Sequence, residues 1–98
     1  MAQLTWSPDA LRDINDTCEV IARTSGSLAT ALGHESRAVA TRIEANRRIG
    51  AVVPEYDRDD VREVQVRNFR LNYRLVGNDV EISLLTSVSR RLPRVPPG

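Results

Sequence analysis

Residues 61–86, VREVQVRNFRLNYRLVGNDVEISLLT, decide the fold of this chain. Apolar residues alternate with polar ones along three consecutive runs, a pattern typical of strands with one buried and one solvated face. Gly77, Asn78 and Asp79 predict a tight hairpin between the second and third runs, because such turns need residues that tolerate positive φ. Asn68 gives a weaker turn signal between the first two. We expect an antiparallel meander with an apolar face that needs a cover and an arginine-rich face left open.

Two amphipathic helices are predicted before the meander. Ser7-Pro8-Asp9 is typical of a helix start, and Ser25-Gly26 is typical of a helix end. A second helix is expected over about residues 27–48, weakened at Gly33. Because the link between the helices is so short, they should form an antiparallel hairpin lying across the apolar face of the meander. A short β-like run at residues 3–6 precedes them.

The predicted fold class is therefore α+β, with an N-terminal strand and a helical hairpin packed on an antiparallel β-meander. Ninety-eight residues fit one domain, 1–98, of which residues 90–98 are a basic, proline-rich tail that is extended or mobile. The spacing predicts one core made of Leu11, Ile14, Val39, Ile43, Val64, Val66, Leu71, Tyr73, Leu75, Val80, Ile82 and Leu84.

Charge is divided unevenly along the chain. Residues 1–61 hold seven arginines and ten acidic residues, a balance of −3, whereas residues 62–98 hold seven arginines and three acidic residues, a balance of +4. Lysine is absent, so it is excluded as a base or nucleophile, and arginine binds phosphate or carboxylate but accepts protons poorly. The basic half can face nucleic acid or an acidic protein, or can be a solvated sheet face with Arg–Glu pairs.

Several classes of protein are disfavoured by the composition. Cys18 is the only cysteine and His34 the only histidine, which excludes an internal disulfide and argues against a protein-only zinc site. We expect no metal and no cofactor. Because no run is long enough to span a membrane and no signal peptide is recognisable, a cytoplasmic protein without a membrane partner is expected.

An ordered set of short motifs runs through the chain: LTWSPDA at 4–10, VPE at 53–55, REV at 62–64, NFRLNYRL at 68–75 and RLP at 91–93. This set resembles the RelE/ParE family of toxins from bacterial type II toxin–antitoxin modules, with a phenylalanine where family members typically carry the first tyrosine of the strand motif. The resemblance covers nearly the whole chain. It implies an α+β fold, a cognate antitoxin protein that wraps the toxin, and a cytosolic target.

Two targets divide the family that the chain resembles. RelE-like members cleave messenger RNA on the ribosome, whereas ParE-like members inhibit DNA gyrase. Ser89 stands where many relatives carry a histidine, and RNA cleavage needs a proton acceptor, for which only Glu55, Glu63 or Glu81 remains. These observations favour a gyrase inhibitor that is not an enzyme. A ribosome-dependent mRNA endonuclease, or a non-toxic relative acting only as a binding protein, stays open as an alternative.

Each alternative has its own site residues. For gyrase inhibition we expect target contacts from the strand-face arginines and the basic tail, namely Arg67, Arg70, Arg74, Arg90, Arg91 and Arg94, with no catalytic residue assigned. For an endonuclease, the first residues to test are Arg62, Arg70, Arg74 and Tyr73. Tyr73 alternates with Leu71 and Leu75, and this pattern also predicts a core aromatic.

Overall fold

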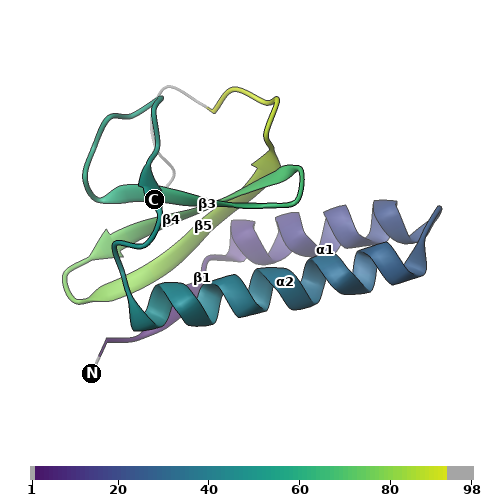
Figure 1. Cartoon of the computed structure of the whole chain (residues 1–98), viewed down its shortest axis with the longest axis horizontal. Coiled ribbons are helices and arrows are strands. Elements are labelled where there is room, and N and C mark those ends of the chain that lie inside the picture. The colour runs from purple at the N-terminus through teal and green to yellow at the C-terminus, as the bar shows by residue number, and fades with distance from the viewer. Residues whose placement is uncertain (1, 93–98) are drawn as a thin grey trace.

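A five-stranded sheet with a helical hairpin on one face is the framework of the protein, shown by a computed structural model that describes residues 2–92 (Figure 1). In chain order the elements are β1 (Leu4–Trp6), α1 (Pro8–Ala22), α2 (Gly26–Ala45), β2 (Ala51–Val52), β3 (Val61–Val66), β4 (Phe69–Val76) and β5 (Asp79–Ser87). The strand order is β1-β5-β4-β3-β2, with β1 parallel to β5 and the other pairs antiparallel. The α+β prediction is confirmed.

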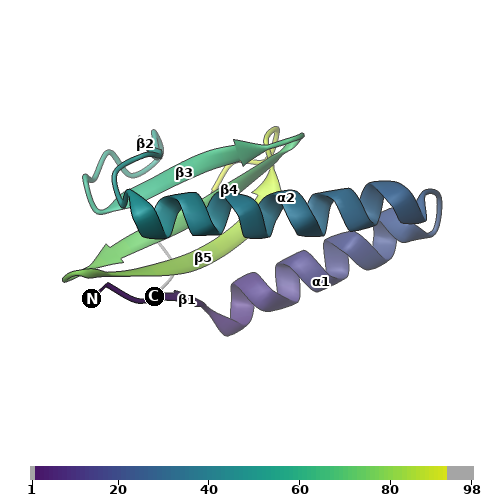
Figure 2. The same ribbon diagram turned by 60° about the horizontal axis from the view of Figure 1, so that its bottom comes forward.

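The first helix begins after its predicted cap, Ser7, whereas α2 begins at Gly26, one residue before the predicted start, with Ser25 as its cap. The Ser7 side chain accepts a hydrogen bond from the N–H of Ala10 at 3.0 Å, and Ser25 does the same for Leu28 at 3.2 Å. Gly33 lies within an uninterrupted helix, so α2 does not break there; it ends at Ala45, a little before the predicted end. Figure 2 shows both helices on the same side of the sheet. No helix within residues 2–92 combines the length and apolarity needed to cross a membrane.

The main core lies between the hairpin and the sheet. Its buried members are Ala10, Leu32, Ile43, Val66, Leu71, Tyr73, Val80, Ile82 and Leu85. Most of the predicted core residues lie in it or pack against it. Leu11 does not, because its side chain is 48% exposed on α1, so the prediction that it is buried is wrong.

A β-bulge in β5 changes which leucine enters this core. Asn72 pairs with Leu84 and Tyr73 pairs with Ile82, so Ser83 is an extra residue on β5. Beyond the bulge the alternation is reversed: Leu85 is 5% exposed in the main core, whereas Leu84 packs against a second cluster. The prediction that Leu84 shares a core with Ile82 is wrong, because it assumed an unbroken period of two.

The second cluster covers the other face of the sheet. It consists of Val53, Val61 and Leu92, with Tyr56 and Leu84 packed against it. These residues come from the loop after β2, from the outward side of the strands and from the segment after β5. The predicted open, arginine-rich face is therefore partly covered, because two stretches distant in sequence fold onto it.

Candidate functional site

Tyr73, one of the candidate endonuclease residues, is fully buried. Its hydroxyl donates a hydrogen bond to the carbonyl oxygen of Arg47 at 2.7 Å and accepts one from the N–H of Gly50 at 2.9 Å. Burial raises the pKa of Tyr73, so the phenol stays protonated at neutral pH. The interpretation of Tyr73 as a core aromatic is confirmed, and its hydroxyl serves to fix the chain that leaves α2.

Arg62 is held by the loop that precedes β3. Its Nε donates to the carbonyl oxygen of Asp59 at 2.9 Å, its Nη1 donates to the carbonyl oxygen of Gly50 at 2.8 Å, and its Nη2 pairs with the Asp59 carboxylate at 2.6 Å. Only 13% of the side chain is exposed. The guanidinium therefore has most of its donors engaged inside the protein, which leaves little of it for a phosphate.

Arg70 lies between two glutamates on the face of the sheet opposite the helices. Its Nη1 and Nη2 bind the Glu55 carboxylate at 2.6 and 2.7 Å, and its Nε binds Glu63 at 2.5 Å. The hydrogen bonds from Arg70 lower the pKa of Glu55 to about 2. A carboxylate with so low a pKa is a poor proton acceptor, so this geometry does not support Glu55 as a general base.

The other two arginines of the meander, Arg74 on β4 and Arg67 in the turn before it, also have acidic partners. Arg74 pairs with Glu81 across β4 and β5 at 3.2 Å, and Arg67 pairs with Glu35 of α2 at 2.8 Å. The Arg67 pair is exposed and therefore contributes little to stability. Arg62, Arg70 and Arg74 on the strands and Arg67 in the turn between β3 and β4 are thus all paired within the protein. The cross-strand pairs Arg70–Glu63 and Arg74–Glu81 are of the kind expected for a sheet face with Arg–Glu pairs.

The C-terminal arginines differ from those of the strands. Arg90 and Arg91 are exposed, and within residues 2–92 neither guanidinium has an acidic partner. They border a hollow of about 440 Å³ at the end of β5, which Asp13 and Leu92 also line. Arg94, and the predicted extended or mobile tail beyond Leu92, lie outside the described residues.

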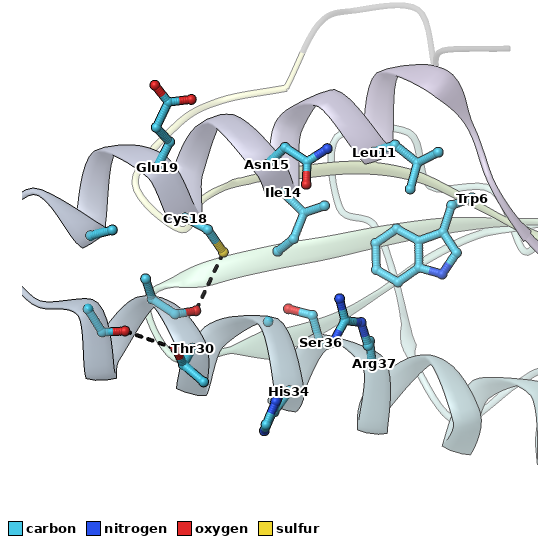
Figure 3. A pocket seen from close by; sticks show the side chains of 14 residues that line it. Trp6, Leu11, Ile14, Asn15, Cys18, Glu19, Thr30, His34, Ser36 and Arg37 are labelled. Atoms are coloured by element: carbon cyan, nitrogen blue, oxygen red, sulfur yellow. Dashed lines mark hydrogen bonds between the residues drawn. The ribbon is translucent and has the colours of Figure 1, made fainter.

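A groove of about 880 Å³ lies between α1 and α2 (Figure 3). Its apolar wall is formed by Leu11, Ile14 and Cys18 of α1, and Figure 3 shows Trp6 lying between the helices at one end. The hydroxyl of Ser36 in its lining is buried and has no hydrogen-bond partner among residues 2–92. Helical periodicity marked Leu11 and Ile14 as apolar, but it could not distinguish a groove wall from a core.

No cluster of three or more His, Cys, Asp or Glu side chains within residues 2–92 is placed to hold a metal ion. The fold is that of a small α+β protein, and its accessible features include an apolar interhelical groove and the exposed Arg90 and Arg91. The arginines and the tyrosine expected for an endonuclease all make hydrogen bonds within the protein.

The family of the chain follows from comparison with known proteins. A family model described as the ParE toxin of the type II toxin–antitoxin system, parDE, matches residues 4–91, and the chain belongs to this ParE toxin family. A solved chain described as the chromosomal ParDE TA system from P. aeruginosa aligns with a TM-score of 0.73 at 18% identity. The alignment covers 89% of this chain and 96% of that chain, and at this identity it shows the shared fold alone. A sequence search of curated proteins gave no match.

Proposed function

We propose that this toxin inhibits DNA gyrase by direct binding, and that a cognate antitoxin neutralises it. The observation that carries the proposal is the contrast between the arginines: the four at positions 62, 67, 70 and 74 are paired, whereas Arg90 and Arg91 are exposed without an acidic partner in the described part of the chain. Unpaired guanidinium groups suit an acidic protein surface or DNA phosphates held by the enzyme. The arginine at position 94 extends the same charge in the sequence.

The geometry gives less support to the endonuclease alternative. Cleavage of RNA by its 2′-hydroxyl needs a proton acceptor and cations that reach the phosphate. The phenol of Tyr73 is buried, the side chain of Arg62 is 13% exposed, and that of Arg70 is 11% exposed. Binding through Arg90 and Arg91 requires none of these groups to be accessible.

The interhelical groove is the surface we propose for the antitoxin. An amphipathic helix can lay an apolar stripe against Leu11 and Ile14, the recognition mode that such grooves serve. The two rims differ in charge, with Glu19 on α1 and Arg37 on α2. The docked helix should therefore present basic residues toward Glu19 and acidic residues toward Arg37.

Substitution of Leu11 separates this surface from the one proposed for the target. Leu11→Arg should abolish the complex with the antitoxin, measured by calorimetry, because a charge would replace an apolar groove wall. Inhibition of gyrase should persist, since Leu11 lines the interhelical groove and not the hollow that Arg90 and Arg91 border. Undiminished antitoxin binding by Leu11→Arg would remove the groove as the antitoxin site.

Two assays run in parallel test the target. One follows supercoiling by purified gyrase as toxin is added, and the other follows messenger RNA on programmed ribosomes. We expect supercoiling to fall while the messenger stays intact. Ribosome-dependent cleavage with normal supercoiling would overturn the proposal and make Arg62, Arg70, Arg74 and Tyr73 the first residues to mutate. No effect in either assay would favour a relative that acts only as a binding protein.

A further inference from the structure

One carboxylate joins three separate parts of the chain on the face of the sheet away from the helices. Glu55, in the loop after β2, binds Arg70 of β4 through both of its oxygens, at 2.6 and 2.7 Å. Its Oε2 also accepts a hydrogen bond from the backbone N–H of Leu92 at 3.2 Å. The segment after β5 is thus attached to the middle of the sheet through a side chain 37 residues earlier.

Two further contacts hold the same segment. The carbonyl oxygen of Arg90 accepts a hydrogen bond from Arg70 Nη1 at 3.4 Å. The Leu92 side chain, 7% exposed, fills the second cluster beside Val53 and Val61. The backbone is therefore held on either side of Arg91, at Arg90 and at Leu92. The exposed guanidinium groups of Arg90 and Arg91 extend from a segment that is attached to the sheet.

The pair at the centre of this arrangement is well suited to a permanent attachment. Arg70 is oriented from its other side by Glu63, and a bidentate arginine–carboxylate pair is directional as well as strong. Because the pKa of Glu55 is lowered to about 2, its carboxylate is charged throughout the neutral range. The attachment should therefore not loosen with physiological changes of pH.

We propose that Glu55 and Arg70 form a latch that positions Arg90 and Arg91 for the target. In this arrangement Arg70 is a positioning residue and makes no contact with the target itself. A pre-ordered segment does not lose its conformational freedom on binding, so the latch increases affinity without adding a contact. The inference rests on the proposed function, because it concerns the surface assigned there to gyrase.

The test compares full-length variants by two readouts. Glu55→Ala should accelerate amide hydrogen exchange at Leu92 about tenfold, since the charged acceptor of that N–H is lost. The same variant should raise the toxin concentration that half-inhibits supercoiling about tenfold, because the segment must then be ordered on binding. Glu55→Gln keeps an oxygen for the Leu92 N–H and should give intermediate values; it carries the test if Glu55→Ala does not fold.

Asp59→Ala is the matched control, because Asp59 is a carboxylate of the same loop that also pairs with two arginines, Arg48 and Arg62, but does not contact Leu92. It should leave both readouts at wild-type values. Unchanged exchange at Leu92 in both Glu55 variants would overturn the latch, and faster exchange with undiminished inhibition would overturn its positioning role. If the wild-type toxin leaves supercoiling intact, the proposed function fails, while exchange at Leu92 still decides whether the latch exists.

Discussion

Gly50 lies against Tyr73 so closely that no side chain fits between them. A Cβ at position 50 would stand 2.8 Å from both Cε1 and the hydroxyl oxygen of Tyr73, and 2.6 Å from the carbonyl oxygen of Glu63. The N–H of Gly50 donates to the same hydroxyl at 2.9 Å. The chain leaving α2 is thereby fixed against the main core at the point where it turns toward β2.

Gly50→Ala should therefore destabilise the protein by about 1–3 kcal/mol, because backbone and a buried ring must move to admit one methyl group. Gly33→Ala is the control: a Cβ there meets nothing within 4 Å, and in a helix interior alanine should stabilise by about 1 kcal/mol. Urea unfolding monitored by circular dichroism measures both. A Gly50→Ala protein as stable as wild type would contradict the packing.

Tyr73→Phe should cost about 1–3 kcal/mol of stability, because the N–H of Gly50 and the carbonyl oxygen of Arg47 lose a buried partner. The same urea titration measures it. Any loss of toxin activity should follow the fraction unfolded. Lost activity in a variant of unchanged stability would instead assign a direct role to the phenol.

Local patterns determined most of the fold, and contacts between distant residues determined what they missed. The start of α1 follows from its local cap Ser7, whereas Ser25, which the sequence indicated as part of a helix end, also caps α2. The bulge at Ser83 leaves no mark in the alternation, because the two leucines that follow it, Leu84 and Leu85, satisfy either register. One turn also places its positive φ on Arg67, where the sequence indicated Asn68.

The candidate site was predictable in composition but not in arrangement. The basic balance of residues 62–98 correctly drew attention to arginines. Whether an arginine is paired depends on neighbours such as Glu35 for Arg67, which lies 32 residues away on α2. The sequence could not separate the residues of the interhelical groove from those of the core, because an apolar helix stripe that is only partly covered looks the same in sequence as a buried one.

The bulge can be tested by comparing two adjacent leucines. Leu85→Ala should cost about 2–5 kcal/mol, because Leu85 lies in the main core at 5% exposure. Leu84→Ala should cost clearly less, since Leu84 is only half-buried at the edge of the second cluster. Thermal unfolding of both variants shows which substitution lowers stability more. A larger loss of stability for Leu84→Ala would contradict the bulge and favour the unbroken alternation of the sequence prediction.

The Glu55–Arg70 pair predicts a specific dependence of stability on pH. The folded-state pKa of Glu55 is about 2, below its ordinary value of 4.5, so its stabilisation is complete above about pH 4.5 and is lost as the pH falls toward 2. Glu55→Gln lacks this titration. The difference in unfolding free energy between wild type and Glu55→Gln should therefore shrink between pH 7 and pH 3. A difference that stays constant would show that Arg70 does not perturb this carboxyl.

The most direct test of the proposed mechanism is a gyrase titration with the three C-terminal arginines replaced. Arg90→Ala, Arg91→Ala and Arg94→Ala remove the charge but keep Leu92, which a truncation would delete from the second cluster. Arg12→Ala, Arg23→Ala and Arg42→Ala make an equal change of charge on the exposed helix surface. We predict that the C-terminal triple variant no longer inhibits supercoiling yet still binds the antitoxin, while the helix variant inhibits like wild type. An unchanged inhibition curve for the C-terminal variant would contradict the mechanism and move the contact back onto the sheet.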